Sequence, residues 1–63
     1  MRPHQERVIE EAEQLLDRIT KLRNFIVTNT FDLLHIDERN RLHAQVAAMT
    51  DYHNILRERI QHF

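Results

Sequence analysis

Apolar residues recur along the C-terminal part of the chain at alternating steps of four and three. The series is Leu42, Val46, Met49, His53, Leu56, Ile60 and Phe63. This spacing keeps one seam of an α-helix facing a partner, so it predicts a helix over about residues 36–62. Gln45, Ala48, Tyr52 and Ile55 run beside the seam and widen the apolar arc. Because one neighbouring helix cannot cover so wide an arc, we expect a second partner outside the chain.

The N-terminal half carries a seam of the same period. Its members are Val8, Ala12, Leu15, Ile19, Leu22 and Ile26. Pro3 suits the first turn of a helix, where its missing N–H has no partner in any case, so a helix is predicted over about residues 3–28. Asn29 offers a left-handed stop for it. Two seams of matched period and length predict an all-α fold, an antiparallel two-helix hairpin forming one domain over residues 1–63.

The connection, residues 29–35, contains three large apolar residues, Phe31, Leu33 and Leu34. We expect them to form a short helical turn folded over the open end of the hairpin. Either His35 or Asp37 can cap the second helix. If His35 is the cap, Glu38 can reach back to its amide, as in a capping box.

The chain has only 63 residues and contains no cysteine. Below roughly 70–80 residues a core seldom supplies more than about 3–5 kcal/mol, and small domains add disulfides, a metal or oligomerisation. The absence of cysteine removes disulfides and the usual cysteine-rich zinc sites. Oligomerisation remains as the stabiliser, so the chain is expected to be a homo-oligomer.

The charge balance narrows the class of partner. A net charge of −1 provides no long-range attraction for duplex nucleic acid or for an anionic membrane, so neither is an expected partner. No apolar run approaches the ~18 residues of a membrane span, and no signal peptide is visible. We expect a soluble intracellular protein. The chain also contains no glycine, hence no glycine-rich phosphate loop and no dinucleotide fingerprint.

Catalytic groups are missing from the sequence. It contains no serine or cysteine nucleophile, and its carboxylates have no apolar pocket to raise a pKa. We therefore expect no enzyme and no cofactor. No two of the five histidines are spaced i, i+4 for a metal site; they are His4, His35, His43, His53 and His62. A metal at a symmetric oligomer axis is kept as a minor alternative, and His53 in the seam is interpreted as a structural residue that fixes register.

Two surface residues allow a ligand-binding role beside a structural one. Lys21 is most simply a solvated side chain whose stem covers apolar surface, and alternatively a phosphate contact. Tyr52 is most simply a residue at the edge of the apolar arc, with its ring packed on the arc and its hydroxyl in solvent. Alternatively, a base stacks on its ring. The structural interpretation is favoured for each residue taken alone, because helix surfaces routinely carry such side chains.

Several motifs occur together along nearly the whole chain. They are Glu6-Arg7, a glutamate one turn on, Leu15, Lys21-Leu22-x-x-Phe25-Ile26, Phe31, Leu34, and Gln45-x-x-x-Met49-x-x-Tyr52-x-x-x-Leu56-x-x-Arg59. In these motifs the chain resembles the small hairpin domain shared by phage anti-CBASS and anti-Thoeris sponges. Short proteins of crAss-like phages are also similar to this domain.

The resemblance implies a hexamer that binds cyclic di- or trinucleotide immune signals in pockets between subunits. Sequestering the signal in the cytoplasm of the host bacterium, without breaking any of its bonds, would inhibit CBASS-type defence. A symmetric oligomer can offer each phosphate a cation and each base a side-chain plane. The expected ligand-binding residues are Arg7, Arg18, Lys21 and Arg59 for phosphates, Phe25 and Tyr52 for stacking, and Gln45 for base edges.

Two other classes of function fit the same helices. One is a protein–protein interaction module that docks a partner through Ala48, Tyr52 and Ile55 and has no nucleotide ligand. The other is a structural phage component.

Overall fold

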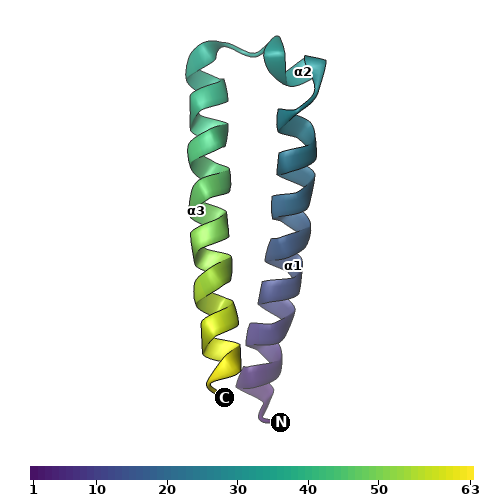
Figure 1. Ribbon diagram of the computed structural model, residues 1–63. Helices are drawn as coiled ribbons and strands as arrows, with labels where there is room; N and C mark the ends of the chain where they lie inside the picture. Colours follow the sequence, from purple (N-terminus) through teal and green to yellow (C-terminus); the bar gives the residue numbers. More distant parts are fainter.

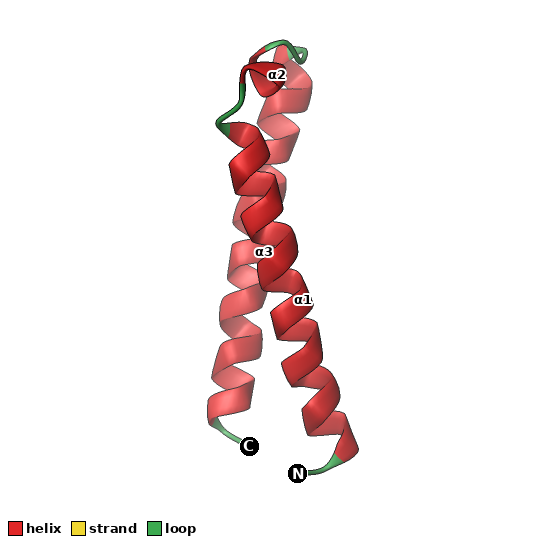
Figure 2. Cartoon of the chain, turned by 90° about the vertical axis from the view of Figure 1, so that its right-hand side faces the viewer, coloured by secondary structure: helices red, strands yellow, loops and turns green.

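Two long antiparallel helices make up the protein. The computed structural model describes all of residues 1–63, with α1 at Pro3–Ile26, α2 at Asn29–Asp32 and α3 at Ile36–Gln61. α1 and α3 lie side by side, with both chain ends at one end of the molecule and α2 at the other (Figure 1). They cross at a shallow angle (Figure 2), in a rod of 46 × 14 × 13 Å. The predicted all-α hairpin is confirmed.

The core is one line of side chains between α1 and α3. Its buried members are Val8, Ala12, Leu15, Ile19 and Leu56, against which Val46, Met49 and Ile60 pack. All of them belong to the two seams read from the sequence, because steps of three and four return to the same side of a helix. The last expected seam residue, Phe63, differs. It is 47% exposed, since α3 ends at Gln61 before reaching it.

A threonine hydroxyl ends α1 and begins α2. Thr28 Oγ1 donates to the carbonyl oxygen of Phe25 at 2.6 Å and accepts from the backbone N–H of Phe31 at 3.2 Å. α1 ends at Ile26, two residues earlier than expected. The left-handed stop expected at Asn29 is wrong: no residue has a positive φ, and Asn29 is the first residue of α2. One hydroxyl satisfies groups of both helices, so no left-handed residue is needed.

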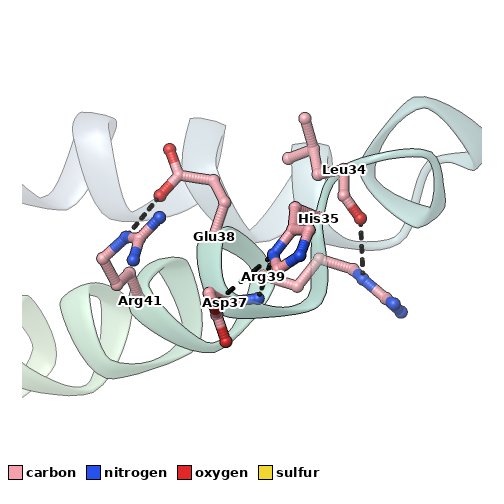
Figure 3. A network of polar contacts seen from close by, with 6 residues as sticks. All are labelled: Leu34, His35, Asp37, Glu38, Arg39 and Arg41. Carbon is pink, nitrogen blue, oxygen red and sulfur yellow. Dashed lines mark hydrogen bonds and ion pairs between the residues drawn. The ribbon is translucent and has the colours of Figure 1, made fainter.

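The short helix α2 closes one end of the hairpin. Phe31 is buried there, and its ring packs nearly perpendicular to the rings of Phe25 and His43, with centroid distances of 6.0 Å and 5.4 Å. Arg39 Nε donates to the carbonyl oxygen of Leu34 at 3.2 Å and fixes the end of the connection to α3 (Figure 3). The expected helical turn over the open end is therefore present, but of its three expected apolar residues only Phe31 lies in α2, and Leu33 is 86% exposed.

His35 is the residue that caps α3. Its Nδ1 accepts from the backbone N–H of Asp37 at 3.1 Å (Figure 3). The capping box expected from Glu38 does not form. Glu38 instead accepts from Nε of Arg41 at 2.9 Å, because a charged donor one turn further along the helix makes a stronger hydrogen bond than a backbone amide.

A hairpin two helices thick leaves most of its surface in contact with water. Only 6 of 63 residues are buried, and the accessible surface is 4988 Å². A compact folded monomer of 7.7 kDa exposes about 4300 Å². The excess, roughly 700 Å², is similar to the ~800 Å² that each partner buries in a standard protein interface. One copy therefore exposes enough surface for an additional packing contact.

Candidate functional site

Five of the seven expected binding residues fall into two rows of heptad spacing. The row on α1 is Glu11, Arg18 and Phe25, and the row on α3 is Gln45, Tyr52 and Arg59. Seven residues are close to two turns of an α-helix, so the members of a row share one side of their helix. Glu11 is the one member that was not expected to take part.

A hydrogen bond between the helices brings the two rows together. The hydroxyl of Tyr52 on α3 donates to Oε2 of Glu11 on α1. The two residues are 41 positions apart in the chain, and the bond places their rows on the same side of the hairpin. Tyr52 is 42% exposed, so its ring is partly open to solvent. We call the surface formed by the two rows the tyrosine face.

The environment of Tyr52 favours its protonated form. The pKa of Tyr52 is raised above the ordinary 10.0, first by its hydrogen bond to Glu11, then by partial desolvation and by repulsion from the Glu11 carboxylate. The positive charge of Arg59 opposes this rise. Arg59 is therefore close enough to Tyr52 to act on the charge of its hydroxyl.

Tyr52 is the only tyrosine, so its ionisation can be followed directly by near-ultraviolet difference absorbance. The midpoint is expected above 10.0, and Glu11→Gln should return it toward 10.0, because an amide is uncharged and a weaker acceptor. Since the folded pKa exceeds the unfolded one, the hydrogen bond stabilises the fold below pH 10.0 and is lost as pH rises through the folded midpoint. An unchanged midpoint in Glu11→Gln would contradict the contact.

A second hydrogen bond joins the helices on the opposite flank. Arg23 Nη2 donates to Thr50 Oγ1 at 3.1 Å. Thr50 precedes Tyr52 by two residues, which is about 200° around the helix. With one bond on each flank, the rotation of α1 and α3 about their axes is held from both sides. The tyrosine face therefore has a fixed composition.

The remaining expected cations border the tyrosine face. Arg7 lies four residues before Glu11, and Lys21 lies three residues after Arg18, so each is one turn from the α1 row. Lys21 Nζ is 2.8 Å from Oδ2 of Asp17 in an exposed i, i+4 ion pair. Arg7 and Arg18 are exposed and make no ion pair within the chain. Their guanidinium groups are free to meet an anion.

Phe25 and Gln45 are already engaged within the hairpin. The Phe25 ring is half-buried against Phe31 at the closed end. Gln45 Nε2 donates to Sδ of Met49 at 3.9 Å, a weak bond that leaves the amide oxygen without a partner. Of the two expected stacking rings, Tyr52 is the more exposed, so it offers the larger plane to a ligand.

One copy of the hairpin holds no enclosed site. It has no pocket, and no three side chains of His, Cys, Asp or Glu are grouped to hold a metal ion. A metal at an oligomer axis stays the minor alternative that it was in the sequence. Neither long helix has the uninterrupted apolar stretch needed to cross a bilayer.

Comparison with known proteins identifies the family. A family model described as Sequestin matches residues 2–62. The chain belongs to the Sequestin family. The family name indicates sequestration, a binding role rather than a catalytic one, which agrees with a sponge-type protein. No curated protein and no solved structure matches the chain. In this Sequestin-family hairpin, the tyrosine face is the surface on which most of the expected binding residues gather.

Proposed function

We propose that this Sequestin-family protein is a phage sponge that binds and sequesters cyclic di- or trinucleotide immune signals and thereby inhibits CBASS-type defence in the cytoplasm of the host bacterium. The observation that carries the proposal is the tyrosine face. There Tyr52 provides an aromatic plane, Gln45 and Glu11 provide polar groups, and arginines lie within a turn or two. A nucleotide needs these three kinds of group.

The charges suit phosphates. Each phosphodiester of a cyclic nucleotide carries one negative charge, and a guanidinium binds its oxygens with two parallel N–H groups. Arg18 and Arg59 lie in the two rows, and neither is used in an ion pair within the chain. Stacking of one base on an aromatic side chain contributes about 1–3 kcal/mol. Tyr52, held by Glu11, is pre-oriented for that contact.

The binding recess is proposed to form between copies. A homo-oligomer, a hexamer by resemblance to the phage sponges, repeats each cation and each ring around a symmetry axis, as the ligand repeats its phosphates and bases. Ala48 and Ile55 lie one turn before and one turn after Tyr52 and are both exposed, Ile55 to 54%, so an apolar strip borders the tyrosine face on α3. If another copy packed on this strip, its surface would lie beside the Tyr52 ring and form one side of the binding recess.

The proposal is tested by isothermal titration of the protein with cyclic GMP-AMP and with cyclic tri-AMP. We expect stoichiometric binding of at least one of them with a sub-micromolar dissociation constant, about −8 kcal/mol or better. Chromatography of the released ligand should recover it intact. Silence with both ligands, and with cyclic di-GMP and cyclic di-AMP, would contradict the sponge and favour a protein–protein interaction module.

Lys21→Ala is expected to weaken cyclic GMP-AMP binding by about 10-fold to 100-fold, because a hydrogen bond to a charged group contributes about 1.5–3 kcal/mol. Helix content and assembly size should not change, since the Asp17 ion pair of Lys21 is exposed. Arg57→Ala, which removes one positive charge two residues from Arg59 and so from another side of α3, is the control. Dissociation of the assembly in Lys21→Ala would make the residue structural.

A further inference from the structure

Glu11 has acceptor capacity that the hairpin does not use. Its Oε2 accepts from the Tyr52 hydroxyl, while Oε1 has no hydrogen bond and the carboxylate is in no ion pair. An ionised carboxylate has about four lone-pair positions for donors. The free positions are held next to the ring on which the proposed base stacks.

A carboxylate at this place needs donors from the ligand. It repels phosphate oxygens, so it cannot take part in phosphate binding. The donors of a nucleotide are its ribose hydroxyls and the N–H groups of its bases. Guanine presents N1–H and N2–H side by side, which match the two oxygens of a carboxylate. Adenine presents one amino group beside the acceptor N1, which a carboxylate repels.

We propose that Glu11 is a specificity-determining residue that favours guanine over adenine in the base stacked on Tyr52. This inference rests on the proposed function, because it concerns the base of the sequestered cyclic nucleotide. Glu11 reads the Watson–Crick edge of the base, Tyr52 holds its plane, and Arg59, seven residues along α3, meets a phosphate. Each copy in an assembly brings the same three groups.

Cyclic di-GMP and cyclic di-AMP test the proposal, since they share ring size and charge and differ in their bases. Isothermal titration of the wild-type protein should show cyclic di-GMP binding at least about 10-fold more tightly, as expected for a well-formed bidentate contact to a base. In Glu11→Gln the two affinities should come within about 2-fold of each other, because an amide has one acceptor oxygen. The change should arise from weaker binding of cyclic di-GMP.

Glu13→Gln is the matched control, with the same loss of charge about 200° around α1 from Glu11. It should keep the wild-type preference. Equal wild-type affinities for the two ligands would overturn the inference and leave the sponge intact, whereas absence of binding to cyclic di-GMP, cyclic di-AMP, cyclic GMP-AMP and cyclic tri-AMP would overturn both. Equal weakening of both ligands in Glu11→Gln would show that Glu11 acts only by holding Tyr52.

Tyr52→Phe keeps the test decisive if Glu11→Gln fails to assemble. It retains the ring and releases both oxygens of Glu11 from the hydroxyl. The preference for cyclic di-GMP should persist in Tyr52→Phe, and its loss would overturn the proposal.

Discussion

Leu56→Ala is expected to unfold most of the protein at micromolar concentration. Leu56 is the one large side chain with 0% exposure, and it packs among Val8, Ala12, Leu15 and Ile19. Truncating Leu56 to alanine should lower the free energy of unfolding by about 2–5 kcal/mol. The hairpin loses the free energy gained by burying the removed carbons, and a cavity is left in their place. A chain of this size has only about 3–5 kcal/mol from its core. Circular dichroism should show most of the helical signal lost.

Leu33→Ala is the matched control for this change. Leu33 is 86% exposed in the connection, so the same truncation removes little buried area. The free energy of unfolding should change by no more than about 0.5 kcal/mol. If Leu56→Ala melts at the wild-type temperature, the line of side chains between α1 and α3 does not determine stability.

The hairpin could be predicted from the spacing of apolar residues alone, because its core is a single line of side chains between two helices. Steps of three and four repeat Val8, Ala12, Leu15 and Ile19 on one side of α1, and the only partner long enough to cover them is α3. Local chemistry limited the cap of α3 to His35 or Asp37, and the structure selects His35. In contrast, the stop at Thr28 was missed, because one hydroxyl serves two helices only after the chain has turned.

The cations and the ring of the candidate site were found in the sequence, but Glu11 was not. Nothing in the sequence distinguishes Glu11 from Glu10 and Glu13. Only the rotation of α1 about its axis relative to α3 decides which of these carboxylates reaches Tyr52. That rotation depends on how the whole seam packs. The one sequence signal that points to Glu11 is its heptad spacing to Arg18 and Phe25. That spacing indicates a site only when it is known that Tyr52 lies on the same side of the hairpin.

The proposed sponge function connects folding to binding. The rows of the tyrosine face are set by the contact of α1 with α3, so the same seam that stabilises one copy orients Tyr52 and Arg59. The excess surface of the hairpin lies outside that seam. In the proposed function, a second contact, between copies, would supply both additional stability and a recess around the ligand.

Ile55→Glu is expected to disperse the assembly. Sedimentation velocity of the wild-type protein at micromolar concentration should give a species several times heavier than the 7.7 kDa chain. Ile55 lies on the outer arc of α3 and is 54% exposed in one copy. Burying an unpaired charge there costs about 3–5 kcal/mol, enough to weaken association by about 100-fold or more. The variant should sediment as the single chain.

Val27→Glu controls for the added charge, because Val27 is exposed between α1 and α2, away from the arc. Its assembly should keep the wild-type mass. Since the proposed recess lies between copies, Ile55→Glu should also lose cyclic nucleotide binding although Tyr52 and Glu11 are unchanged. A wild-type protein that is a well-folded monomer at micromolar concentration would remove the recess, because one hairpin has no pocket in which to hold the ligand.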